Sequence, residues 1–212
     1  MHQKDIAEVF QAAGFRNRPA IIIGTGPSLD IEAVKAAQEK GALLFGVNNT
    51  YLDFDLDVWI ACDPAWHEIY SPVSGRFDKW HWDLSVCEKH GYQYIEGRWG
   101  DGLSVSPEHI HYGHSSGYQA LNLAVLYGCS PIILVGYDMH YDGDSRHYFN
   151  GLSDKCGEYP QALRKFSKFD GLIKCYETIA EQKGLPEIIN CTPGSALKCF
   201  PFGRLNDPNL YS

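Results

Sequence analysis

Short apolar runs without polar alternation recur along the chain and predict buried strands. They occupy residues 19–24, 43–47, 57–62, 131–135 and 187–190. A strand that is apolar on both of its sides is typical of a parallel sheet that helices cover on both faces.

Segments with helical spacing of apolar residues lie before, between and after these runs. Residues 4–13, 115–127 and 166–183 show this spacing, and residues 31–39 follow Ser28 and Asp30, either of which can cap a helix. Strands that alternate with helices predict βαβ units. We therefore expect an α/β fold with a Rossmann-like, mostly parallel central sheet flanked by helices.

Two stretches interrupt this alternation. Residues 64–114 are rich in aromatic residues and contain one candidate strand, at 92–96, while residues 139–165 include a long polar loop. Core packing or a lid is the expected role of the tryptophans, and stacking on a base or sugar is the alternative. We expect a single domain over residues 1–212, with both stretches as loop or lid insertions and the first as a loop-rich aromatic lid.

Composition and charge narrow the class of protein. The formal net charge of −8 argues against general nucleic-acid binding, which needs clustered Lys and Arg. Seven scattered cysteines without a CxxC pair indicate reduced thiols, and neither a signal peptide nor a membrane-length apolar run is present. We expect a cytoplasmic protein that binds small molecules and has no membrane span, and the sequence leaves a homo-oligomer open.

Polar side chains gather where the predicted strands end. In parallel sheets, ligands bind outside the carboxyl ends of the strands. We therefore expect these side chains to form one site, and the candidates are Thr25, Ser28, Asn48, Asn49, Asp63, Asp138, His140, Thr192 and Ser195.

The turn after the first predicted strand is rich in glycine and precedes a predicted helix. Gly24 and Gly26 allow the backbone to approach an anion closely, and the N–H groups at the start of the next helix then face a phosphate. The turn, which ends at Ser28, matches neither the Walker A nor the GxGxxG pattern, so a plain tight turn is the alternative.

Each of the other strand-end candidates also has a structural alternative. Asn48 and Asn49 can read a ribose or a base, or form an Asx turn. Asp63 can hold Mg²⁺ or a sugar hydroxyl, or cap a helix before Pro64. The segment 115–117 can contact a second anion at a helix start, or simply supply the cap.

The segment 136–148 has the densest set of reactive side chains. A histidine there can take a proton from an acceptor hydroxyl, while tyrosine and arginine can stabilise a leaving phosphate. A polar surface loop or a metal site of three aspartates is the alternative. The residues concerned are Asp138, His140, Asp142, Asp144, Arg146, His147 and Tyr148. A metal site at His109, His111 and His114 lacks further ligands at standard spacing, which favours a solvated loop.

The order of these motifs resembles that of two related groups. One is the bacterial sialyltransferases of glycosyltransferase family 42, and the other is the MptE-like (DUF115) family, which includes archaeal 6-hydroxymethyl-dihydropterin diphosphokinases; phage-encoded proteins have a similar motif order. Residues 24–29 are similar to the sialyltransferase loop Gly-Asn-Gly-Pro-Ser-Leu, with Thr25 in place of Asn. Residues 47–49 and the stretch 116–138 are similar to the family's strand end and its Ser-Gly helix and following strand.

The resemblance implies roles for individual residues. Asn48 would contact the nucleotide of the donor, and His140 and His147 lie near positions where the sialyltransferases hold the donor phosphate with Tyr. The other residues that it places at the nucleotide are Ser115, Ser116, Gly117 and the loop 191–197, with Thr192 and Ser195. The family's general-base His is missing, because residues 158–170 contain no histidine.

Three hypotheses follow. The first is a transferase that uses a nucleotide sugar similar to a CMP-sugar, with a small-molecule or glycan acceptor and with His140 or His147 as the proton acceptor. The second is a diphosphokinase that uses ATP and Mg²⁺, with the metal held by Asp63 and Asp138. The third is a nucleotide-binding protein without catalysis. The first and third need no cofactor.

Overall fold

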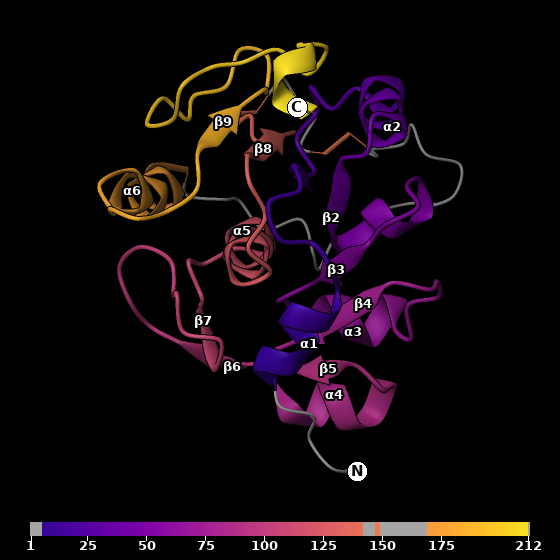
Figure 1. The fold of residues 1–212 in the computed structure, drawn as a ribbon. Helices are drawn as coiled ribbons and strands as arrows, with labels where there is room; N and C mark the ends of the chain where they lie inside the picture. Colours follow the sequence, from indigo (N-terminus) through magenta and orange to yellow (C-terminus); the bar gives the residue numbers. More distant parts are fainter. Residues whose placement is uncertain (1–5, 142–146, 149–168, 212) are drawn as a thin grey trace.

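Seven strands form one sheet in which every neighbouring pair is parallel (Figure 1). The computed structural model describes residues 6–141, 147–148 and 169–211. The strand order is β5-β4-β3-β2-β1-β8-β9. Their bounds are β1 Ala20–Ile23, β2 Leu43–Val47, β3 Val58–Ile60, β4 Asp78–His81, β5 Gln93–Tyr94, β8 Ile132–Val135 and β9 Ile188–Asn190. The α/β, Rossmann-like arrangement is therefore confirmed.

Two apolar cores lie on the two faces of this sheet, because successive strand residues point to opposite sides. Ile22 of β1 belongs to one core and Ile21 and Ile23 to the other. The first core also includes residues of α1 (Ile6–Ala12), α5 (Ser116–Leu126) and α6 (Phe169–Ala180). The second includes residues of α2 (Ile31–Glu39), α3 (Pro64–Tyr70) and α4 (Leu84–His90). Helices therefore cover both faces, which explains why the central strands have no polar side.

Residues 64–114 differ from the expected loop-rich aromatic lid. They contain α3, β4, α4 and β5, and also β6 (Glu96–Arg98) and β7 (His109–His111), which form a second, two-stranded parallel sheet. Trp66 and Trp80 are buried in the two cores. This stretch therefore consists of short helices and strands, and core packing, one of the two expected roles, holds for Trp66 and Trp80 but not for the exposed Trp99. The second expected insertion, 139–165, lies mostly outside the described residues.

The direction of the strand order changes at β1. Strands β2 to β5 follow on one side of β1, and β8 and β9 lie on the other. Adjacent chain connections diverge at such a point, so the carboxyl ends of β1 and β8 border a crevice. None of the helices within the described ranges has the length and apolar character needed to cross a lipid bilayer.

Candidate functional site

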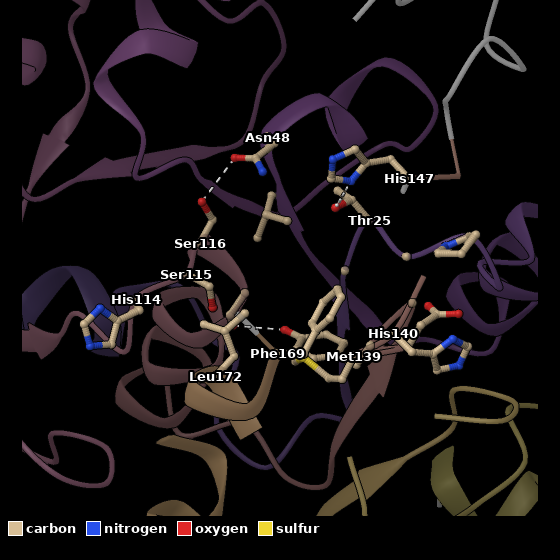
Figure 2. A pocket seen from close by; sticks show the side chains of 18 of the residues that line it. Thr25, Asn48, His114, Ser115, Ser116, Met139, His140, His147, Phe169 and Leu172 are labelled. Atoms are coloured by element: carbon tan, nitrogen blue, oxygen red, sulfur yellow. Dashed lines mark hydrogen bonds between the residues drawn. The ribbon is translucent and has the colours of Figure 1, made fainter. Parts of the chain in front are cut away.

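A pocket of about 360 Å³ opens at this crevice (Figure 2). It is lined by the segments that follow β1, β2, β3 and β8, by the start of α5 and by part of α6. The structure thus brings most of the candidate residues to one place: Gly24, Thr25, Gly26, Asn48, Asp63, Ser115, Ser116, Gly117, Asp138, His140 and His147. Ser28, Asn49, Tyr148, Thr192 and Ser195 are not part of its lining.

The glycine-rich turn packs against the segment after β8. The N–H of Gly24 donates to the carbonyl of Val135 at 2.8 Å, and that of Gly26 donates to the carbonyl of Gly136 at 2.9 Å. A Cβ on Gly26 would overlap both the Gly136 carbonyl and the carboxylate of Asp138. The two glycines therefore permit close packing of two loops, whereas the sequence suggested that they allow close approach to an anion.

Asp138 occupies the position at Ser28 where a phosphate was expected. Its Oδ1 accepts the N–H of Ser28 at 3.1 Å, and its backbone carbonyl accepts the N–H of Ala196 at 2.8 Å. The residue is only 4% exposed, and its Oδ2 has no partner among the described residues. The carboxylate of Asp138 therefore takes the N–H of Ser28 that the sequence offered to a phosphate.

The N-terminus of α5 provides an alternative anion contact. The first N–H groups of a helix have no partner within the helix. The Oγ of Ser115 accepts the N–H of Tyr118 at 3.2 Å and its carbonyl accepts the N–H of Gln119. The N–H groups of Ser116 and Gly117 remain, and no acceptor for them lies within the described residues. Both residues line the pocket, and the helix dipole favours negative charge at this point.

The amide of Asn48 adds a third donor. The N–H of Cys62 donates to Ser116 Oγ at 3.0 Å, and Ser116 Oγ donates to Asn48 Oδ1 at 3.1 Å. This chain of hydrogen bonds leaves the Nδ2 of Asn48 directed toward the pocket (Figure 2), with no acceptor among the described residues. Amide and backbone N–H groups from two elements therefore converge.

Left-handed backbone conformations are concentrated around the same pocket. Four non-glycine residues within the described ranges have a positive φ, and three of them line the pocket: Asn48 (48°), His114 (60°) and Met139 (54°). A left-handed conformation costs energy for most residues and is common at functional sites. Asn and His adopt this conformation more readily than most residues, so Met139 is the lining residue at which the conformation is least expected.

Comparisons with protein-family models, curated proteins and solved structures found no match for this chain. Its function is therefore inferred from the chemistry of the pocket.

His147 is attached to the glycine-rich turn. Its Nδ1 lies 3.0 Å from Thr25 Oγ1, and the N–H of Tyr148 donates to the carbonyl of Thr25 at 3.0 Å. The hydroxyl of Tyr148 donates to Asp53, so this side chain anchors the segment outside the pocket. His140 is exposed at the rim, where its Nδ1 lies 3.2 Å from the carbonyl of Tyr141. Of the two histidines, His147 is therefore held against the glycine-rich turn, whereas His140 lies exposed at the rim.

Cys62, Tyr137 and Tyr176 also line the pocket and were not among the individual site candidates, although Tyr137 lies in the segment 136–148. Burial raises the pKa of the Cys62 thiol and raises the pKa of both tyrosine hydroxyls. At neutral pH these groups are uncharged, and the hydroxyl of Tyr137 donates to the carbonyl of Gly117 at 3.0 Å. The position of Cys62 at the end of a predicted strand was the available signal for it.

The candidates outside the pocket support its walls. Asn49 is fully buried and accepts the indole N–H of Trp66 at 2.7 Å. Thr192 Oγ1 accepts the N–H of Tyr137 at 3.0 Å, and Ser195 donates to the carbonyl of the same residue. These contacts fix the segment that carries Asp138. Asp63 lines the pocket and also caps α3, because its Oδ1 accepts the N–H of Ala65.

The charge of the lining is acidic in the part of the chain that the structure describes. Asp63 and Asp138 are its carboxylates, and no Lys or Arg belongs to it. Within the same residues, no three side chains of His, Cys, Asp or Glu are placed to hold a metal ion. An anion in this pocket would be bound by neutral N–H donors and by the dipole of α5.

Proposed function

We propose that the protein is a nucleotide-binding transferase that uses a nucleotide-activated sugar as its donor. The observation that carries this proposal is the convergence of Asn48 Nδ2 with the N–H groups of Ser116 and Gly117 in the crevice beside β1. Such a set of donors suits the phosphate of a nucleotide. The resemblance to the family 42 sialyltransferases adds support, because it places the same three residues at the donor.

The transfer step would use the opposite wall of the pocket. A hydroxyl oxygen of the acceptor forms a bond to the sugar carbon, while the bond from that carbon to the phosphate oxygen breaks and its electron pair leaves with the nucleotide. In the tautomer in which Nδ1–H of His147 donates to Thr25 Oγ1, Nε2 is the ring nitrogen that can accept the hydroxyl proton. The N–H donors of α5 stabilise the charge that develops on the leaving phosphate.

One observation favours a second candidate, a diphosphokinase of the MptE type. Asp63 and Asp138 both line the pocket, and Mg²⁺ is commonly held by one or two carboxylates together with substrate phosphates. These two residues would hold the ion, which would neutralise charge between the phosphates of ATP. The buried Oδ2 of Asp138, which has no hydrogen-bond partner among the described residues, is consistent with such a role.

A ligand-stabilisation screen tests these proposals. The melting temperature is measured with CMP, CDP, UDP, ATP and GTP, each with and without Mg²⁺. Stabilisation by cytidine nucleotides without metal is the expected result, and an ATP response that requires Mg²⁺ would support the diphosphokinase instead. No response to any nucleotide would contradict both. Release of CMP from a CMP-sugar then separates a transferase from a protein that only binds.

The variant Asn48→Asp tests within this screen whether the amide of Asn48 binds the nucleotide. Aspartate tolerates the left-handed conformation of Asn48 and keeps an oxygen that accepts from Ser116, but it replaces the amide donors with a negative charge. We expect the affinity for the nucleotide to fall by about ten-fold or more, and a ten-fold loss corresponds to about 1.4 kcal/mol. Asn206→Asp adds the same charge outside this pocket and should leave the response intact. Equal effects of both variants would contradict the assignment.

A further inference from the structure

The small second sheet places aromatic side chains next to His114, which lines the pocket. Its strands β6 and β7 are parallel, and Arg98 pairs with His111. Their carboxyl ends therefore lie at the same edge, where Trp99 and Tyr112 follow directly, and the N–H of Tyr112 donates to the carbonyl of Arg98 at 3.0 Å. Gly113 and His114 then lead into the start of α5.

Trp99 differs in its exposure from the tryptophans that pack in the two cores. Its side chain is 71% exposed, whereas Trp59, Trp66 and Trp80 are buried. Single exposed apolar residues are common on protein surfaces, but Trp99 is held in place by other rings. Its ring centre lies 5.0 Å from that of Tyr112 in an edge-to-face arrangement and 4.9 Å from that of His114. The indole is thus a preorganised flat surface.

This aromatic surface is continuous with the anion contacts of the pocket. His114 lines the pocket and is followed directly by Ser115, the cap of α5. Its backbone has a φ of 60°, and a Cβ on the preceding Gly113 would overlap the ring of Tyr118. The chain between the aromatic surface and the donors of Ser116 and Gly117 is therefore fixed by packing.

We propose that Trp99, together with His114, binds the base of the nucleotide by stacking. This inference rests on the proposed function and adds to it the location of the nucleotide base. His147 and Thr25 lie across the pocket from His114 (Figure 2), so the reacting group belongs there and the unreactive nucleoside belongs at the aromatic end. Aromatic stacking accepts any base, because every base has a flat π-face.

Binding measurements with Trp99 variants test this assignment. The probes are CMP and AMP, with ribose 5-phosphate as a ligand that has the phosphate and the sugar but no base. Loss of one stacking contact weakens binding by about ten-fold, so Trp99→Ala should lower the affinity for the better of the two nucleotides by that factor. Binding of ribose 5-phosphate should not change. Trp99→Phe, which keeps a ring, should retain most of the affinity.

Phe202→Ala is the matched control, because Phe202 is a large exposed aromatic residue (51% exposed) outside the lining of this pocket. It should leave all three affinities unchanged. A second readout is quenching of tryptophan fluorescence by iodide, which reaches exposed indoles. The nucleotide should protect the wild-type protein, and ribose 5-phosphate should not.

The possible outcomes separate the two proposals. If Trp99→Ala weakens the binding of ribose 5-phosphate as much as that of the nucleotide, or weakens the binding of neither, stacking of the base is refuted. The proposal of a nucleotide pocket is then unaffected. Iodide quenching that the nucleotide leaves unchanged refutes stacking as well. If neither nucleotide binds the wild-type protein, the proposed function fails and this inference fails with it.

Discussion

Gly26 packs so closely against the carboxylate of Asp138 that no side chain fits at position 26. The carboxylate of Asp138 lies where a side chain on residue 26 would begin, and the N–H of Ser28 holds its Oδ1. This contact joins the segment after β1 to the segment after β8, which are the two walls of the crevice. The identity of residue 26 therefore matters for the shape of the site.

Substitution of Gly26 by Ala should destabilise the fold. The new Cβ would overlap the carbonyl of Gly136, which is backbone and cannot rotate away. Overpacking of this kind costs about 1–3 kcal/mol, measurable as a lower midpoint of urea unfolding. Gly171→Ala is the control, since nothing lies within 4 Å of a Cβ at this exposed position of α6. It should raise stability by up to about 1 kcal/mol, and a similar loss in both variants would argue against the packing explanation.

The sequence predicted which residues lie near the site better than it predicted their roles. The ends of parallel strands meet at one edge whatever the side chains are, so residues such as Thr25, Asn48 and Asp63 could be foreseen. The residue pattern alone did not decide which of two adjacent asparagines faces the pocket, because that depends on the left-handed conformation of Asn48, and only the resemblance singled out Asn48. The partners of the glycine N–H groups likewise depend on contacts with a strand far away in the sequence.

At the scale of elements, the bounds of buried strands and capped helices were predictable. β2 and α2 begin and end at the predicted residues, because a continuous apolar run and the cap Asp30 mark them. Among the short elements between β3 and α5, β5 lies within the candidate strand 92–96, but β4, α4, β6 and β7 were missed. β4 has the sequence Asp-Lys-Trp-His, which lacks a strand pattern, and its pairing with β3 makes it a strand. Tertiary contacts decide such segments.

The N-terminus of α5 allows its structural role to be separated from its binding role. Ser115→Ala removes the cap and should destabilise the protein by about 1 kcal/mol. Ser115→Asp keeps a good cap and should preserve the melting temperature, but its charge should weaken nucleotide binding. Thermal unfolding with and without CMP measures both effects. If CMP stabilises Ser115→Asp as much as the wild-type protein, the phosphate does not bind at this helix start.

At the scale of the whole molecule, buried histidines connect stability to pH. His81 of β4 is fully buried, its ring lies against that of His67, and its Nδ1 accepts the N–H of Asp83 at 2.9 Å. Burial, with a smaller contribution from His67, lowers the pKa of His81 to about 4. Burial also lowers the pKa of His67, whose Nε2 lies 2.9 Å from the carbonyl of Ala61. Both side chains are neutral in the folded protein at neutral pH.

Acidification should therefore destabilise the fold. Above pH 6.5 His81 is neutral in both states and its full contribution is present. As the pH falls from 6.5 toward 4, the unfolded chain binds a proton that the folded chain does not, so stability decreases, by about 3 kcal/mol for this residue. Urea unfolding at pH 7 and pH 4 measures the loss. His81→Asn, which keeps an acceptor for Asp83, should reduce it, and an identical loss in the variant would exclude His81 as the cause.

The position of β1 in the centre of the sheet has a consequence for how the protein folds. Ala20 of β1 pairs with Leu43 of β2 and also with Ile132 of β8, so one of its two partners lies far along the chain. Contacts of such long range are slow to form because a large loop must close first. On the ribosome, β1 to β5 can associate before β8 has been synthesised. The pocket at the crevice is completed only after β8 and then α6 have been synthesised, so it is among the last parts of the sheet edge to form.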